Sequence, residues 1–180
     1  MLASLNVRDA ELAFRAITCA APAGLGRVER HDVAEAATVT LKAAMAEASS
    51  RDRIARQYVT DFEDVFERGE PTLQAALERS DEPKWATLAV YLEFLCAFPD
   101  SHIVRKHGTA TAPDICRSAA RYHERIRSAE SPAALLPDLL TWDTLLKERG
   151  INPGTSADLT VATLFAHRLR TILPSARNND

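Results

Sequence analysis

Residues 53–66, RIARQYVTDFEDVF, carry the clearest pattern in the chain. Apolar side chains recur there at intervals of three or four residues, which is the spacing of one face of an α-helix. They are Ile54, Tyr58, Phe62, Val65 and Phe66. The charged residues of the segment fall on the opposite face. This stretch therefore predicts one amphipathic helix and indicates a helical fold.

The same spacing recurs along the rest of the chain. Further apolar stripes lie within residues 13–17, 33–45, 85–96, 115–126, 135–146 and 159–172. No segment alternates convincingly at the period of two that is typical of a β-strand. We find no internal repeat and no interdomain linker. The sequence predicts an all-α protein in which residues 1–180 form a single compact domain of about seven or eight helices.

Composition narrows the function classes. The chain has 180 residues, 46% hydrophobic and 26% charged, with a formal net charge of −3. This balance disfavours a basic nucleic-acid-binding protein, and no apolar run approaches the ~20 residues of a membrane-spanning helix. Three cysteines without CxxC spacing, and an N-terminus without the features of a signal peptide, predict a cytoplasmic protein.

Three segments interrupt the helical pattern and hold most of the glycine, proline and histidine: residues 22–32, 98–108 and 152–158. Loops carry a large share of binding and catalytic residues. We therefore expect the candidate functional residues in these segments.

Residues 98–108 combine a carboxylate, a hydroxyl, two imidazoles and two cations. Asp100 is a candidate Mg²⁺ ligand or proton acceptor, and Arg105 and Lys106 are candidates for neutralising phosphate oxygens. A structural interpretation is also available, because Asp100 or Ser101 could cap a short helix that ends in basic residues. The sequence leaves both open.

Residues 152–158 lead into the last predicted helix. Thr155 and Asp158 have the spacing of a capping box, with Asp in place of the usual Glu. Gly154, followed by Thr155 and Ser156, also predicts free N–H groups at a helix N-terminus, a geometry that binds phosphate. The segment is not a Walker A loop, because it lacks the second glycine and the lysine.

Residues 22–32 form the third segment. Arg27, Arg30 and His31 could line an anionic ligand, or the segment could be a solvated loop between helices. The pair His31-Asp32 is similar to part of the metal-binding set of HD-type phosphohydrolases, although no histidine precedes His31 to supply the first ligand.

The remaining cysteines and histidines lie within predicted helices. No histidine stands at useful spacing from Cys19, Cys96 or Cys116, so we expect small buried hydrophobic residues. For His123 and His167 we expect a surface or core role rather than metal ligation.

Two of these blocks, in their order and spacing, resemble the triphosphoribosyl-dephospho-CoA synthase family. Asp100-Ser101-His102, followed by Arg105 and Gly108, is similar to the family's Asp-Thr-Asn-like start and later Arg and Gly. Residues 152–165 look like the family's Ser/Asn-Pro-Gly-x-x-Ala-Asp-Leu block. The pattern is closer still to a divergent branch found with genes of one-carbon metabolism and tetrahydromethanopterin synthesis. The resemblance spans nearly all of this chain and the C-terminal two-thirds of the family.

The resemblance implies an enzyme that transfers a triphosphoribosyl group from ATP to dephospho-CoA, or to a related acceptor, and releases adenine. It implies a catalytic role for Asp100, His102 and Asp158, with Mg²⁺ accompanying ATP and held by the two aspartates. The implied phosphate- or nucleotide-binding residues are Arg105, Lys106, Gly154, Thr155 and Ser156, with Arg27 and Arg30 as further candidates.

The resemblance also implies a homo-oligomer, or a partner that supplies what corresponds to the family's N-terminal third. Two alternatives stay open. One is a non-enzymatic helical module that binds a nucleotide or a partner protein, and the other is a metal-dependent HD-type phosphohydrolase.

Overall fold

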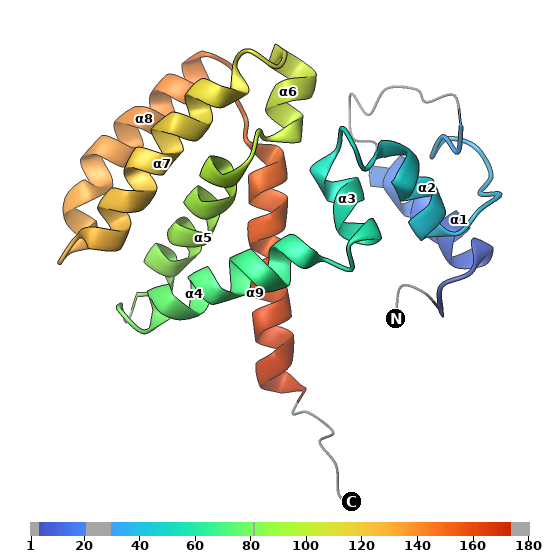
Figure 1. Cartoon of the computed structure of the whole chain (residues 1–180), viewed down its shortest axis with the longest axis horizontal. Coiled ribbons are helices and arrows are strands. Elements are labelled where there is room, and N and C mark those ends of the chain that lie inside the picture. Colours follow the sequence, from blue (N-terminus) through green and yellow to red (C-terminus); the bar gives the residue numbers. More distant parts are fainter. Residues whose placement is uncertain (1–3, 21–29, 81, 174–180) are drawn as a thin grey trace, which may run out of the picture. The chain divides into compact units, whose positions relative to one another are not determined.

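The computed structural model describes residues 4–20, 30–80 and 82–173 (Figure 1). Their regular secondary structure is entirely helical, which confirms the all-α prediction. They contain nine α-helices, against the seven or eight predicted. None of the helices in these ranges is both long and apolar enough to cross a membrane.

Packing divides the chain into two compact units, Met1–Phe62 and Glu63–Asp180. Compact packing units can belong to one folding domain, so the single domain over residues 1–180 stays a prediction. The first unit contains α1 (Val7–Ala20), α2 (Leu41–Ala48) and α3 (Arg53–Val59). Its small core is formed by Ala10, Phe14, Leu41 and Ala44.

The prediction of one continuous helix over residues 53–66 is wrong. α3 ends at Val59, and Asp61 and Phe62 adopt left-handed backbone conformations with φ of 54° and 63°. The N–H of Phe62 donates to the carbonyl oxygen of Gln57 at 2.7 Å, the six-to-one bond of a Schellman helix end. Aspartate tolerates the left-handed conformation better than most residues, so a helix end is possible here without glycine.

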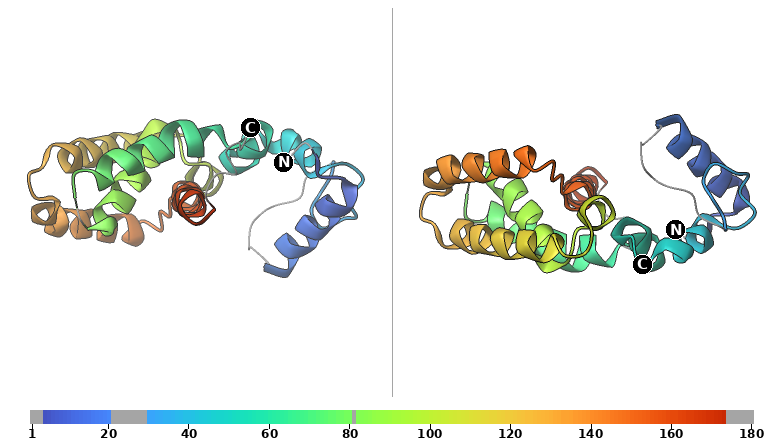
Figure 2. Two further views of the ribbon diagram at one scale, coloured as in Figure 1. Left: turned by 90° about the horizontal axis from the view of Figure 1, so that it is seen from below. Right: turned by 90° about the horizontal axis from the view of Figure 1, so that it is seen from above.

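The second unit begins with a π-helical turn, η2 (Val65–Gly69), and α4 (Glu70–Leu77). It continues with α5 (Pro83–Ala97), α6 (Ser101–His107), α7 (Ala112–Ser128), the 3₁₀ turn η3 (Pro132–Leu135), α8 (Leu136–Glu148) and α9 (Gly154–Ile172). Figure 2 shows α8 returning along α7 after the turn at η3.

α5 is the centre of this unit. It packs most extensively against α7 and also against α4 and α9. Leu92, Phe94 and Leu95 on α5 are fully buried, together with Ile115 on α7 and Leu159 on α9. A helix surrounded by others is apolar around most of its circumference, which is why its sequence shows a run of apolar residues.

The end of α8 sets the start of α9. Gly150 has φ of 65°, and its N–H donates to the carbonyl oxygen of Lys147 at 2.9 Å. The N–H of Ile151 donates to the carbonyl oxygen of Leu146, also at 2.9 Å, and both side chains are buried. This complete Schellman motif stops the helix and turns the chain towards Gly154.

Candidate functional site

The blocks around residues 98–108 and 152–158 meet at the side chain of Asp100, which is 1% exposed. Its Oδ1 accepts hydrogen bonds from the N–H groups of His102 at 2.9 Å and Ile103 at 3.2 Å. Its Oδ2 accepts from the N–H and the hydroxyl of Ser156, both at 2.8 Å. One carboxylate therefore joins the N-termini of α6 and α9.

This arrangement explains why a buried carboxylate is stable. The N-terminus of each helix carries a partial positive charge, and Asp100 lies between two of them. An ionised carboxylate has about four lone-pair positions, and Asp100 uses four. The donors of Ser156, which the sequence predicted for phosphate, are therefore engaged by an anion of the chain itself.

Asp100 in this geometry does not fit a Mg²⁺ ligand. Coordination to the metal would require one of its four hydrogen bonds to break inside a buried site, leaving an N–H or hydroxyl without a partner.

His102 makes the second link between the blocks. Its N–H also approaches Thr155 Oγ1 at 3.2 Å, and its ring covers Gly154, where an added Cβ would lie 3.1 Å from Nδ1. Nη2 of Arg105 lies 3.3 Å from the same Nδ1. Because a guanidinium only donates, this contact fits a ring whose Nδ1 is the acceptor.

The other charged candidates of these blocks, in contrast to Asp100, lie at the surface. Arg105 and Lys106 are exposed in the last turn of α6. Asp158 is exposed one turn beyond Gly154 on the same face of α9, because residues four apart are neighbours on a helix. His102 covers this face at Gly154.

The other predicted residues lie elsewhere. Arg27 falls outside the described residues. Arg30 belongs to the first unit, where it pairs with Glu47 at 3.7 Å. Asp32 is buried and accepts from the N–H of Ala34 at 2.9 Å, and His31 approaches a threonine hydroxyl. Among the described residues, neither His31 nor Asp32 belongs to a group of three possible metal ligands.

A pocket of about 210 Å³ lies at the opposite end of α5 from Asp100. Arg79, Trp85 and Ile126 are among its lining residues. The 15 residues of α5 correspond to roughly 22 Å of helix. This pocket is therefore separate from the site at Asp100.

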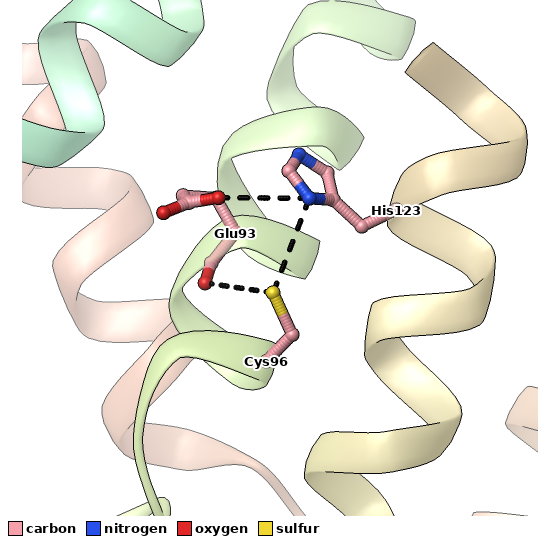
Figure 3. Close-up of side chains that lie close together, drawn as sticks. All are labelled: Glu93, Cys96 and His123. Carbon is pink, nitrogen blue, oxygen red and sulfur yellow. Dashed lines mark hydrogen bonds and ion pairs between the residues drawn. The ribbon is translucent and has the colours of Figure 1, made fainter. Parts of the chain in front are cut away.

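One group of side chains was missed by the sequence analysis. Glu93 and Cys96 on α5 lie beside His123 on α7, with ligand atoms within 4.8 Å of one another (Figure 3). Cys96 and His123 are 27 residues apart, so their proximity depends on helix packing rather than spacing. The expected buried, hydrophobic role of Cys96 does not describe these polar contacts.

The chain matches the model of the ATP:dephospho-CoA triphosphoribosyl transferase family over residues 1–176. This is the family that the two sequence blocks resemble. Searches of curated proteins and of solved structures found no match. Since the family match spans nearly the whole chain, this protein belongs to the ATP:dephospho-CoA triphosphoribosyl transferase family.

Proposed function

We propose that this protein transfers a triphosphoribosyl group from ATP to the 2′-hydroxyl of dephospho-CoA, or of a related acceptor. The hydroxyl oxygen bonds to the anomeric carbon, the bond from that carbon to the base nitrogen breaks, and adenine leaves. The hydroxyl proton passes to a base. The observation that carries the proposal is that the chain matches the family over residues 1–176 and that the two blocks resembling it are joined through Asp100 and His102.

The exposed charges suit the demands of this reaction. Arg105 and Lys106 neutralise triphosphate oxygens, and His102 contacts the ribose or the leaving base. Asp158, which is exposed, takes the hydroxyl proton or contacts Mg²⁺ that arrives with ATP. Asp100 positions the two helix N-termini rather than reacting. The proposal includes membership of the divergent branch found with genes of one-carbon metabolism, dephospho-CoA or a related molecule as the acceptor, and a cytoplasmic location.

Replacing Arg105 and Lys106 by alanine tests the phosphate assignment. Each hydrogen bond to a charged group is worth about 1.5–3 kcal/mol, so each variant should weaken ATP binding by about 10–100-fold. Isothermal titration with ATP and Mg²⁺ measures the affinity, and chromatography of released adenine measures turnover with dephospho-CoA.

Arg117→Ala and Lys147→Ala are matched controls, since both are exposed cations paired to a neighbouring aspartate on their own helices, Asp114 and Asp143. Unchanged ATP affinity in the Arg105 and Lys106 variants would remove these residues from the site. ATP binding without adenine release, in the presence of dephospho-CoA, would favour the non-enzymatic module. Tightly bound Mn²⁺ or iron in the purified protein would favour the phosphohydrolase.

We also propose that the protein forms a homo-oligomer through α9. Large apolar side chains on one face of this helix are strongly exposed, including Val161 at 65%, Phe165 at 63% and Ile172 at 58%. Their spacing of four and seven residues places them on a single stripe. Contiguous exposed apolar surface of this kind is typical of an interface.

Phe165→Ser should therefore shift the protein towards the monomer in light scattering coupled to size-exclusion chromatography. Leu12→Ser is the control, because Leu12 on α1 is 55% exposed and lies outside the stripe. A wild-type chain that is monomeric at all concentrations would contradict the homo-oligomer and turn the search to a different partner chain.

A further inference from the structure

The cluster of Glu93, Cys96 and His123 brings three different metal-binding groups together. Nδ1 of His123 lies 3.5 Å from Oε2 of Glu93 and 3.9 Å from Sγ of Cys96. Glu93 and Cys96 are three residues apart on α5 and share a face, and His123 reaches them from α7 (Figure 3).

These separations are close to those of a zinc site. With ordinary Zn–N, Zn–O and Zn–S bond lengths and tetrahedral angles, ligand atoms lie about 3.3–3.6 Å apart. The two distances to Nδ1 of His123 exceed the expected values by up to a few tenths of an ångström, and the carboxylate oxygen and Sγ lie within 4.8 Å of each other. Side-chain rotation must bring the ligand atoms closer together, while α5 and α7, the most extensively packed pair of helices in the second unit, hold the backbone in place.

We propose that Glu93, Cys96 and His123 bind one Zn²⁺ ion through Oε2, Sγ and Nδ1, with water in the fourth position. A mixed nitrogen, sulfur and oxygen set favours Zn²⁺ over the hard cations Mg²⁺ and Ca²⁺, which prefer oxygen ligands alone. The site lies on α5 and α7 and involves none of the residues assigned to nucleotide binding. The proposed zinc site is therefore independent of the transferase proposal.

The surroundings of the three ligands suit this role. Nη1 of Arg68 donates to Oε1 of Glu93 at 2.6 Å, which orients the carboxylate and leaves Oε2 facing the imidazole. Outer hydrogen bonds of this kind hold metal ligands in place. The side chains of Glu93 and His123 are 16% and 18% exposed, so the ion and its water have access to solvent.

The thiol of Cys96 must lose its proton when a metal ion binds. Burial and the nearby Glu93 carboxylate raise the pKa of Cys96 to about 11, so its thiol is protonated at neutral pH and donates to the carbonyl oxygen of Glu93. Burial lowers the pKa of His123, which keeps the imidazole neutral and able to ligate. Zn²⁺ binds Cys96 as the thiolate, so binding moves one proton from Sγ to solvent.

Cobalt substitution tests the site in the full-length chain. Protein stripped with a chelator and dialysed is titrated with Co²⁺, followed by Zn²⁺. We expect one equivalent of Co²⁺ to produce a near-ultraviolet thiolate charge-transfer band and the strong visible bands of a four-coordinate ion. One equivalent of Zn²⁺ should abolish both. Each Co²⁺ should release one proton, measured with a pH indicator in weak buffer.

The variants assign the ligands. Cys96→Ser should abolish the charge-transfer band and the released proton, and His123→Gln should weaken Co²⁺ binding by on the order of 100-fold while keeping the band at saturation. Arg68→Gln should weaken binding by about 10-fold through the carboxylate. Circular dichroism establishes that each variant is folded, and two independent ligand variants keep the test decisive if one of them unfolds.

The matched controls are Cys116→Ser and His167→Gln. Cys116 is also half-buried, and its thiol donates to the carbonyl oxygen of Phe98 at 3.4 Å. Both controls should bind Co²⁺ as the wild type does. Absence of a charge-transfer band in the wild type, or a band that survives Cys96→Ser, would overturn the proposal and leave the cluster as a polar contact between two helices.

Discussion

Asp100→Ala is expected to lower the free energy of unfolding by about 3–5 kcal/mol, measured by urea denaturation followed by circular dichroism. Losing a helix N-cap costs about 1 kcal/mol. The variant also leaves the N–H and hydroxyl of Ser156 buried without an acceptor, and an unsatisfied buried donor costs about 1–3 kcal/mol. The two effects add because one side chain serves two helices.

A matched control separates these two contributions. Asp52 caps α3 with the same pair of bonds, to the N–H groups of Ile54 at 2.8 Å and Ala55 at 3.1 Å. For the loss of this cap, Asp52→Ala should cost about 1 kcal/mol. If Asp100→Ala is no more damaging than Asp52→Ala, the bonds to Ser156 do not contribute as described.

Asp100→Asn separates a positioning role from a chemical one. Asparagine is a good N-cap, but its amide group cannot accept hydrogen bonds from Ser156. We expect a loss of about 1–3 kcal/mol in unfolding free energy, and turnover within about tenfold of the wild type at temperatures where the variant is folded. A loss of several orders of magnitude in kcat with wild-type stability would instead place Asp100 in the reaction.

Local sequence patterns predicted the helical fold and the residues at the starts of α6 and α9. The spacing of apolar residues predicted the helices, and Asp100 was identified as a possible N-cap because aspartate before a helical segment has a local partner in the following N–H groups. The glycine and hydroxyl residues at 154–156 were likewise recognised as a helix start. These features depend on residues within a few positions of one another.

Contacts between distant segments could not be predicted in the same way. Ser156 is 56 residues from Asp100, and its hydroxyl meets Oδ2 only because the end of α8 directs α9 towards α6. The meeting of Cys96 and His123 likewise depends on the rotation of α5 and α7 about their axes. A helical periodicity identifies the buried face of each helix but not the partner of a given side chain.

The break at Asp61 shows a different limit. Apolar residues continue at helical spacing through residues 54–66, and no glycine or proline interrupts them. The helix nevertheless ends, because Asp61 and Phe62 adopt positive φ and the following residues start a π-helical turn. The spacing of the apolar side chains is the same for a continuous helix and for a helix that ends before Asp61. Periodicity alone could therefore not distinguish the two.

Gly69, the last residue of the π-helical turn η2, lies tightly against α5 and α9. A Cβ at Gly69 would lie 2.8 Å from Cζ of Phe94 and closer still to Oγ1 of Thr163. Both neighbours are fully buried, and Thr163 Oγ1 donates to the carbonyl oxygen of Leu159 at 2.8 Å. Neither side chain can move without losing packing or that hydrogen bond.

Gly69→Ala should therefore lower the free energy of unfolding by about 2–4 kcal/mol, since overpacking a core typically costs about 1–3 kcal/mol and the Thr163 hydrogen bond is also at risk. The sign of this change in unfolding free energy is informative, because replacing a helical glycine by alanine otherwise stabilises a protein by about 0.5–1 kcal/mol. Gly154→Ala is the control, since its Cβ would meet only the His102 ring, at 3.1 Å, and should cost less.

A double-mutant cycle with Thr163→Ala tests the cause of this effect. Removing Oγ1 and Cγ2 of Thr163 opens space for the new methyl group, so Gly69→Ala should be markedly less damaging in the Thr163→Ala background than in the wild type. Strictly additive losses would show that steric conflict with α9 is not responsible. A Gly69→Ala variant as stable as the wild type would contradict the close packing of η2 against α9, and with it the geometry that holds α9 in place beneath Asp100.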